Sequence, residues 1–343
     1  MGSRYENNFD FLRFFAASLV ILSHSYPLLR GSDETEPFQV LTGNMTFGLL
    51  AIAIFFMMSG YLISTSWNNE PSLIRFFWKR CLRIYPGIIL TTLFSLLIIG
   101  PLNTSLSFAE YFGNISLIKY ASSIVLFRQD PLPGVFLNTP FPVAVNGSLW
   151  SVFLEFTMYV LVALIGLIGL LKKREAIIVL LILEVLLLYR YTEFTGIAQC
   201  VVYFMIGVLY NVYQDRIKYN YKIIFVLLPF WIITFKTELY PFISFIFISY
   251  LMFYTAFLPV RSLHRFGKHG DFSYGLYIFA FPIQQTIVNL WPGNLNTHEF
   301  FILSMGLTLP MAILSWKLVE SRALKIKPVA STRFTNPAKI VKK

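Results

Sequence analysis

The sequence predicts an all-α fold, a polytopic membrane helical bundle with about ten transmembrane helices and both termini in the cytoplasm. Three observations predict this. First, 56% of the 343 residues are hydrophobic and only 13% are charged, whereas soluble domains average about 25% charged residues. Second, apolar stretches recur along the whole chain. Third, lysine and arginine gather in alternate connections between these stretches, as they do in multi-pass membrane proteins.

Ten apolar stretches account for most of the chain. They cover residues 9–29, 46–66, 84–100, 149–171, 176–190, 196–213, 222–236, 239–259, 272–291 and 300–318. The third, fifth and seventh are short for a hydrocarbon core about 30 Å thick. We expect these three to be extended at their ends or sheltered by neighbouring helices.

The distribution of basic residues predicts the orientation of the chain. With the N-terminus inside and ten spans, only five of the 28 lysines and arginines face the outside, namely Arg30, Lys119, Arg128, Arg190 and Lys236. Cytoplasmic connections are enriched in lysine and arginine, so this orientation is favoured. We expect one membrane domain over residues 1–322 and a basic cytoplasmic tail over residues 323–343, whose composition predicts disorder.

One long outer connection runs from about residue 101 to residue 148. Ser107 and Glu110 have the spacing of a capping box, which predicts the start of a helix. Apolar residues that suit a helix at the membrane surface follow it, namely Phe108, Phe112, Ile115 and Ile118. Several prolines in the second half predict an extended, ordered cover.

The first apolar stretch carries two ionisable residues, Arg13 and His24. Eleven residues apart, at ~100° and ~1.5 Å per residue, they project from one helical face about 16 Å apart. Asp10 precedes Arg13 by three residues and can pair with it. Ionisable residues at membrane depth are costly and commonly mark a functional site. His24 is either a histidine hydrogen-bonded between helices or a general base that is open to the outer surface.

Glu155 is the second intramembrane candidate. It lies two turns into the fourth stretch, which enters from outside, so its expected depth of about 10 Å resembles that of His24. A carboxylate at this depth can orient the imidazole and stabilise its protonated form. The alternative is a purely structural hydrogen bond to the outer loop.

A basic run at the cytoplasmic start of the third stretch is the third candidate. Arg75, Lys79 and Arg83 share one helical face at positions i, i+4 and i+8, and Arg80 lies beside them. Such a cluster can bind phosphate groups. It can equally anchor the helix against anionic lipid.

Some classes of site are excluded by the same composition. Cys81 and Cys200 provide neither a disulfide framework nor the spacing of metal ligands, so we expect no metal and no bound cofactor. The net charge is +11, but the basic residues alternate with apolar spans instead of forming one patch. We therefore expect a lipid bilayer and not a nucleic acid as partner.

Six segments resemble, in order, the motifs of acyltransferase family 3, integral-membrane acyltransferases that modify surface glycans and related molecules. They are Phe9 through Arg13 to His24, Phe55–Ile63, Lys79–Pro86, Asn146–Ser151 followed by Glu155, Asp271–Tyr277, and Val319–Ser321. Each motif is weak alone, but together they cover nearly the whole chain. One departure is visible, because many members carry a histidine three residues after the tyrosine that matches Tyr277, where this chain has Ala280.

The resemblance implies an acyl-CoA donor, usually acetyl-CoA, used as a co-substrate from the cytoplasm, and a location in the bacterial inner membrane. It implies His24 as the catalytic residue and Arg13 as essential. The basic cluster would then hold the donor, through Arg75, Lys79, Arg80 and Arg83. We see no counterpart of the extracellular hydrolase-like domain that some members append, so transfer is expected to finish within the membrane domain.

We further hypothesise roles for residues around the acceptor, which we expect to be a hydroxyl of a surface carbohydrate or lipid-linked glycan. His24 would deprotonate this hydroxyl, and Glu155 would hold the resulting imidazolium. Ser148 and Trp150 would shape the mouth for the acceptor, and Tyr277 is a further supporting residue.

Two other functions are compatible with intramembrane polar residues. A transporter or flippase would use His24, Glu155 and Arg13 as a translocation path, although no internal repeat is apparent. A non-catalytic assembly or lipid-binding subunit would leave two buried titratable groups unexplained. A measurement of acyl-CoA turnover would distinguish an enzyme from both a transporter and a non-catalytic subunit.

Overall fold

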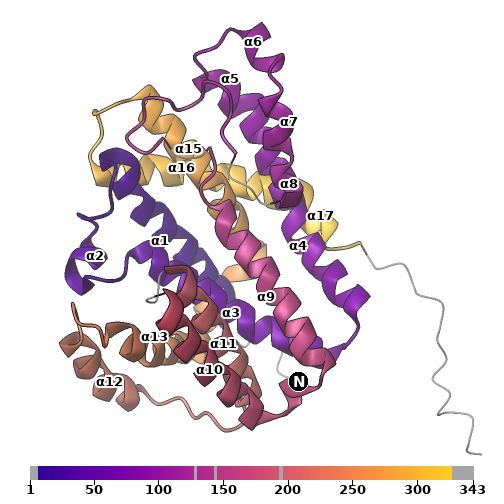
Figure 1. The fold of residues 1–343 in the computed structure, drawn as a ribbon, viewed down its shortest axis with the longest axis vertical. Helices are drawn as coiled ribbons and strands as arrows, with labels where there is room; N and C mark the ends of the chain where they lie inside the picture. Colours follow the sequence, from indigo (N-terminus) through magenta and orange to yellow (C-terminus); the bar gives the residue numbers. More distant parts are fainter. Residues whose placement is uncertain (1–6, 127–129, 143–144, 193–195, 327–343) are drawn as a thin grey trace, which may run out of the picture.

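The computed structural model describes residues 7–126, 130–142, 145–192 and 196–326 (Figure 1). Over these residues the chain is helical and has no strand, only an isolated bridge between Thr104 and Val135. The predicted all-α fold class is therefore confirmed. Of the predicted tail, residues 327–343 lie outside the described residues.

A helix forms at each of the ten predicted apolar stretches. These helices are α1 (Phe9–Arg30), α3 (Phe47–Asn69), α4 (Leu73–Phe94), α9 (Leu149–Leu167), α10 (Arg174–Thr192), α11 (Gly196–Val212), α12 (Tyr221–Ile233), α13 (Tyr240–Phe257), α15 (Ser273–Leu290) and α16 (Thr297–Ser315). Shorter elements occupy the connections: α2 (Pro37–Thr42), η1 (Ser95–Ile99), α5 (Gly100–Asn103), α6 (Phe108–Phe112), α7 (Ser116–Ala121), α8 (Ser123–Leu126), η2 (Leu170–Lys172), α14 (Arg261–His264), η3 (Phe266–His269), η4 (Trp316–Glu320) and α17 (Ser321–Ala323).

Six of the described helical segments are long and apolar enough to cross a membrane. They are α1, α3, α9, α13, the run Leu73–Asn103 that begins with α4, and the run Thr297–Ala323 that begins with α16. Helices α11 and α12 are apolar but shorter. The third predicted stretch is thus extended at both ends, as expected, and reaches 31 residues. These lengths and compositions are those of a helical membrane protein.

Helix α3 lies at the centre of the bundle and packs backbone to backbone against α11. A Cβ atom at Gly60 would come within 2.0 Å of the Phe204 carbonyl oxygen, and one at Gly207 within 2.2 Å of the Met57 carbonyl oxygen. Only glycine at both positions permits this approach, which is a common way for helices to associate where lipid replaces water. This contact fixes the position of α3, which forms one wall of the cavity described below.

Helices α1 and α15 pack side by side next to α3. The Gln284 side chain donates to the Ile21 carbonyl across this interface, at 2.9 Å. Ala280 is fully buried in an apolar cluster with Ala17 and Ile21. The position where many relatives carry a histidine is therefore part of the dry contact between α1 and α15.

The connection from about residue 101 to residue 148 places α5 and α6 at the top of Figure 1 and α7 and α8 beside α4. The predicted capping box is confirmed, because Ser107 accepts from the Glu110 backbone and the Glu110 carboxylate accepts from the Ser107 backbone. These hydrogen bonds lower the pKa of Glu110. Tyr111 is fully buried and donates to the Leu96 carbonyl at 2.9 Å. The apolar residues predicted to lie at a membrane surface point outward, with Phe108 75% exposed.

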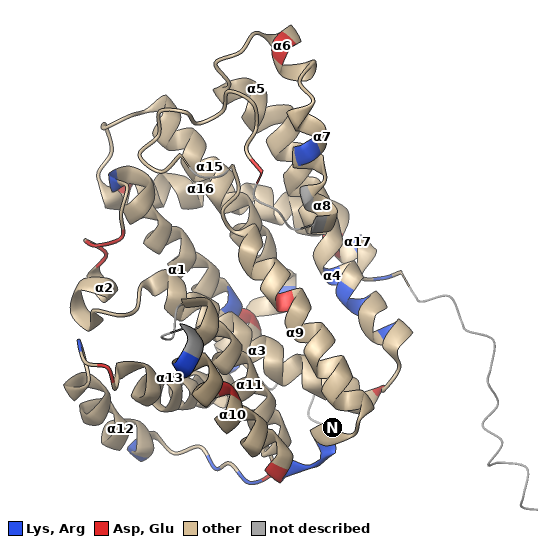
Figure 2. Ribbon diagram, viewed as in Figure 1, with Lys and Arg blue, Asp and Glu red and all other residues tan. Residues whose placement is uncertain are grey.

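Basic residues gather in particular connections between the helices. Figure 2 shows them in the connection between α9 and α10, in the one between α11 and α12, and at the start of α4. Arg174 at the first of these pairs with Asp215 at the second, at 2.6 Å. The predicted cytoplasmic clusters from these three connections therefore lie at the same end of the molecule in this view.

Candidate active site

A cavity of about 690 Å³ lies between α1, α3, α4, α9 and α15. It follows α3 from Ile52 to Ile63, about 16 Å at the helical rise. Cationic side chains line it toward the C-terminal end of α3: Arg13, Lys79, Arg80, Arg83 and Lys268. Its other end is formed by Phe55, Ser151 and Tyr277. In the described part of the chain, no cluster of histidine, cysteine and acidic residues suits a metal ion.

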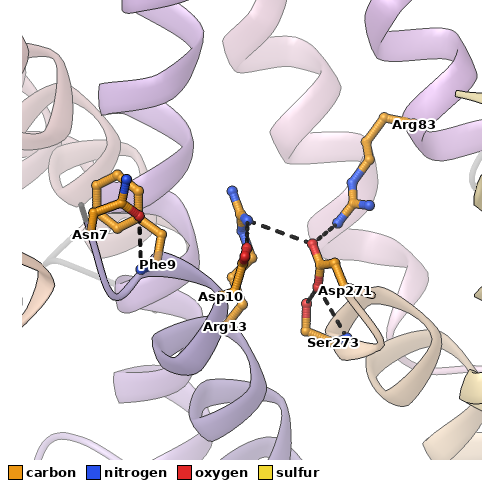
Figure 3. A network of polar contacts seen from close by, with 7 residues as sticks. All are labelled: Asn7, Phe9, Asp10, Arg13, Arg83, Asp271 and Ser273. Atoms are coloured by element: carbon orange, nitrogen blue, oxygen red, sulfur yellow. Dashed lines mark hydrogen bonds and ion pairs between the residues drawn. The ribbon is translucent and has the colours of Figure 1, made fainter. Parts of the chain in front are cut away.

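Asp271, just before α15, pairs with one arginine from each of two other helices, α1 and α4, at the cavity wall (Figure 3). Its Oδ2 lies 2.6 Å from Arg83 on α4 and 3.5 Å from Arg13 on α1. Its Oδ1 accepts from the backbone and hydroxyl of Ser273, at the start of α15. Arg13 also pairs with Asp10 at 3.0 Å, as predicted from their spacing. One carboxylate therefore connects α1, α4 and α15.

The charge of Asp271 is maintained by its neighbours. Burial raises its pKa, but the cations of Arg83 and Arg13 and the hydrogen bonds from Ser273 outweigh burial and lower the pKa to about 2. Asp271 is therefore ionised at neutral pH, and its charge offsets the repulsion between the two arginines that it bridges.

Glu155 on α9 faces the same cavity. Its Oε1 accepts from Ser59 at 3.0 Å and from Tyr159 at 2.6 Å. Arg80 lies on the other side of Tyr159, with its guanidinium 5.8 Å from the ring centre. The Arg80 guanidinium donates to the Ser66 hydroxyl at 2.6 Å. The acid and the cation thus flank one tyrosine in the cavity wall.

The predicted basic stripe is divided between different partners. Arg75 and Lys79 both pair with Glu70, the latter at 2.7 Å. Their hydrogen bonds lower the pKa of Glu70. Lys79, Arg80 and Arg83 line the cavity, and Arg75 does not. The structure therefore brings three of the four predicted donor-binding residues together.

His24 does not line the cavity and lies near the end that Tyr277 forms, because it contacts Phe281, which is on the same helix as Tyr277. Its ring contacts the edge of Phe281, with 5.3 Å between ring centres, and Phe281 follows Tyr277 by one turn of α15. The Nδ1 atom of His24 is buried without a hydrogen-bond partner. Because α1 is continuous from Phe9 to Arg30, Arg13 and His24 share one face as expected.

The structure corrects the predicted depth of Glu155. Gly48 of α3 lies against Ser23, next to His24, with 3.0 Å from its Cβ position to the Ser23 hydroxyl. Glu155 instead bonds Ser59, eleven residues further along α3, which is about 16 Å deeper. Helix α9 starts beneath the outer loop and not level with the end of α1, so counting from helix ends misplaced it. No contact described here joins Glu155 to His24.

The predicted supporting residues are divided: Asp10 and Tyr277 line the cavity, and Ser148 and Trp150 do not. Tyr277 shares a hydrogen bond of 2.5 Å with Ser151 and donates to the Ser148 carbonyl at 3.3 Å. The Ser148 hydroxyl is buried without a partner. Trp150 is partly buried against the apolar core and does not line the cavity. Gly147 packs on the Phe281 ring, where a Cβ would come within 2.6 Å.

Comparison with known proteins places these motifs in one family. Residues 6–317 match the model of a family described as an acyltransferase domain. The chain is 32% identical to an O-acetyl transferase of Shigella phage Sf6, over 93% of this chain and 96% of that protein. It is 27% identical to nodulation protein 10 of Rhizobium leguminosarum bv. viciae, over 95% of each. No solved structure matches.

The chain belongs to the acyltransferase family. It is therefore an acyltransferase, an enzyme that moves an acyl group, as the sequence motifs imply. Five of its six motif segments contribute side chains to the cavity lining, and Val319–Ser321 does not.

Several cavity residues of the acyltransferase were not singled out from the sequence. Asp271 was noted only as part of a motif, although an acid that opens a span after a basic connection is a recognisable signal. Tyr159 and Ser59 carry no such signal, because a tyrosine and a serine in apolar helices are ordinary. Lys268 lies in the connection before α15, where a basic residue is ordinary for membrane topology, so its place in the cavity has no signal of its own.

Proposed function

We propose that this acyltransferase is an O-acyltransferase of the bacterial inner membrane with about ten spans and cytoplasmic termini. It moves an acyl group from cytoplasmic acyl-CoA to a hydroxyl of a surface carbohydrate or lipid-linked glycan. The name of the phage relative, O-acetyl transferase, favours acetyl as the group and oxygen as the acceptor atom. The resemblance to a family that modifies surface glycans favours the carbohydrate.

The observation that carries this proposal is the polarity of the cavity. Coenzyme A is a polyphosphate head on a long, mostly apolar arm, and the cavity has cations at one end and an apolar stem with hydroxyls at the other. Arginine is suited to phosphate because its fork donates two hydrogen bonds. The arm would then extend past Arg13 and bring the thioester toward Ser151 and Tyr277.

His24 would act beyond that end of the cavity. The acceptor oxygen attacks the thioester carbonyl carbon, its proton passes to the imidazole, the carbon–sulfur bond breaks, and coenzyme A leaves as the thiolate that the imidazolium protonates. The unpartnered Nδ1 of His24 is an atom that can accept a hydroxyl proton. General-base catalysis of this kind contributes about 10²–10⁴ in rate.

Arg83 and Lys79 would have to exchange partners when donor binds. Each holds a carboxylate in this structure, Asp271 and Glu70 respectively. A phosphate group carries more charge than a carboxylate and can accept two hydrogen bonds from the arginine fork. Arg75 lies outside the cavity, which supports the alternative role of this one residue as an anchor to anionic lipid.

The test replaces His24 by glutamine in purified protein and measures acyl transfer from acetyl-CoA. We expect turnover to fall by about 10²–10⁴, the contribution of a placed base, with coenzyme A binding retained because His24 lies outside the cavity. The matched control is His298→Gln, a change at an exposed histidine near the start of α16, which should leave turnover unchanged. Undiminished transfer by His24→Gln would remove His24 from the mechanism.

A further inference from the structure

We propose that Glu155 and Arg80 form a subsite that binds the amide groups of the donor's pantetheine arm. This inference rests on the proposed acyl-CoA donor and gives Glu155 a role different from the one expected from sequence. An amide has one N–H donor and one carbonyl acceptor. A carboxylate and a guanidinium on the wall of one channel are complementary to it.

Glu155 has one oxygen available to a ligand. Both of its described hydrogen bonds, from Ser59 and Tyr159, end on Oε1. Its Oε2 has no hydrogen bond among the described contacts, and it is not among the buried unpartnered atoms. Because Glu155 lines the cavity, Oε2 is the oxygen that faces it. The two bonds to Oε1 fix the carboxylate in this orientation.

Arg80 is fixed in a comparable way. One terminal nitrogen donates to Ser66, and the guanidinium lies over the rings of Phe76 and Tyr159, at 5.1 and 5.8 Å. Its Nε is buried without a partner. A buried N–H without an acceptor is unfavourable. The Nη1 atom of Arg80 has no hydrogen bond among the described contacts and, unlike Nε, is not among the buried unpartnered atoms, so Nη1 is the donor that can face a ligand in the cavity.

Glu155 lies at the middle of the path proposed for the donor, and Arg80, which bonds Ser66, lies on its cationic side. Arg83 and Lys268 lie toward the cationic end of the cavity, and Ser151 and Tyr277 form the opposite end. Glu155 follows Ser151 by one turn of α9, so it lies between the two ends. Apolar side chains line the same stretch, including Met58 and Val152, and they suit the methyl and methylene groups between the amides.

A purely structural role explains this arrangement less well than ligand binding does. A carboxylate needed only for packing would use both oxygens inside the protein, since an unpaired polar atom at a membrane-buried site is unfavourable. Pairing with His24 is not formed, because Glu155 lies about 16 Å deeper along α3 by helical rise. A ligand that supplies one donor and one acceptor completes both side chains.

The test compares two ligands on purified protein, coenzyme A and adenosine 3′,5′-bisphosphate, which has the nucleotide phosphates and no pantetheine arm. For Glu155→Gln we expect the Kd for coenzyme A to rise about tenfold or more, the effect of one hydrogen bond to a charged group. The Kd for the bisphosphate should stay within about twofold. Glu155→Asp keeps the charge, but its shorter side chain moves the carboxylate oxygen away from the cavity. It should therefore give the same pattern for the two ligands. The pH profile of kcat should be unchanged in both variants.

The matched control is Glu70→Gln, which removes another carboxylate near the cationic end and should change the affinity for both ligands by the same factor. If Glu155→Gln and Glu155→Asp also change both ligands equally, or change neither, the subsite is refuted. A shifted pH profile of kcat would return Glu155 to a partnership with His24. If the wild type binds neither ligand, the acyl-CoA donor itself is wrong.

Discussion

Among single residues, Asp271 has the largest structural role that the contacts reveal. It is 14% exposed and neutralises Arg83 and Arg13 from two different helices. Removing one partner of a buried ion pair leaves a charge without compensation, which is more costly than the pair itself is favourable. The same residue keeps both arginines at the cavity wall, where the proposed donor phosphates would bind.

Asp271→Asn should therefore destabilise the protein by about 3 kcal/mol. This is the low end of the range for breaking a buried ion pair, because water in the adjoining cavity can solvate the arginines that are left. The folded-state pKa of Asp271 is about 2, below the ordinary value, so its contribution is complete above about pH 4 and is lost as pH falls toward 2. Thermal unfolding in detergent at pH 7 and pH 5 should show the same loss.

Asp215→Asn is the matched control, since its pair with Arg174 has an aspartate 57% exposed and exposed pairs contribute under about 1 kcal/mol. Equal melting temperatures for Asp271→Asn and the wild type would show that the network does not hold the three helices.

At the scale of helices, the contact of α3 with α11 decides whether the cavity wall is in place. Gly60→Ala would put a methyl group against the Phe204 carbonyl and force the helices apart, at about 1–3 kcal/mol or more. The apparent Tm of this variant should fall. Gly306→Ala in α16, where nothing lies within 4 Å, should be neutral or stabilising by up to about 1 kcal/mol. A Tm loss shared by both variants would contradict this packing.

The helices also show which parts of the structure could be predicted from sequence. Apolar runs locate all ten helices, and helical spacing pairs Arg13 with Asp10 correctly, because both depend on residues near one another in the chain. The depth of Glu155 was misjudged, because it depends on how far α9 is shifted along α3. The partner of Arg83, Asp271, lies 188 residues away, and no local pattern reveals that pairing.

At the scale of the whole molecule, the proposal requires the two ends of the site to serve opposite sides of the membrane. The cations of the cavity lie toward the C-terminal end of α3, and His24 lies level with its start. Basic connections also gather at one end of the bundle (Figure 2). Charge and site polarity are thus both consistent with the proposal that the donor enters from the side where lysine and arginine are enriched.

The side from which the donor enters is the most direct test. Acetyl-CoA carrying a labelled acetyl group does not cross a membrane unaided, so it can be supplied to inverted or to right-side-out vesicles of cells that make the enzyme and its acceptor. We predict incorporation of label in inverted vesicles, loss of that incorporation in His24→Gln, and none in right-side-out vesicles. Equal labelling from both faces, or labelling only in right-side-out vesicles, would contradict the account.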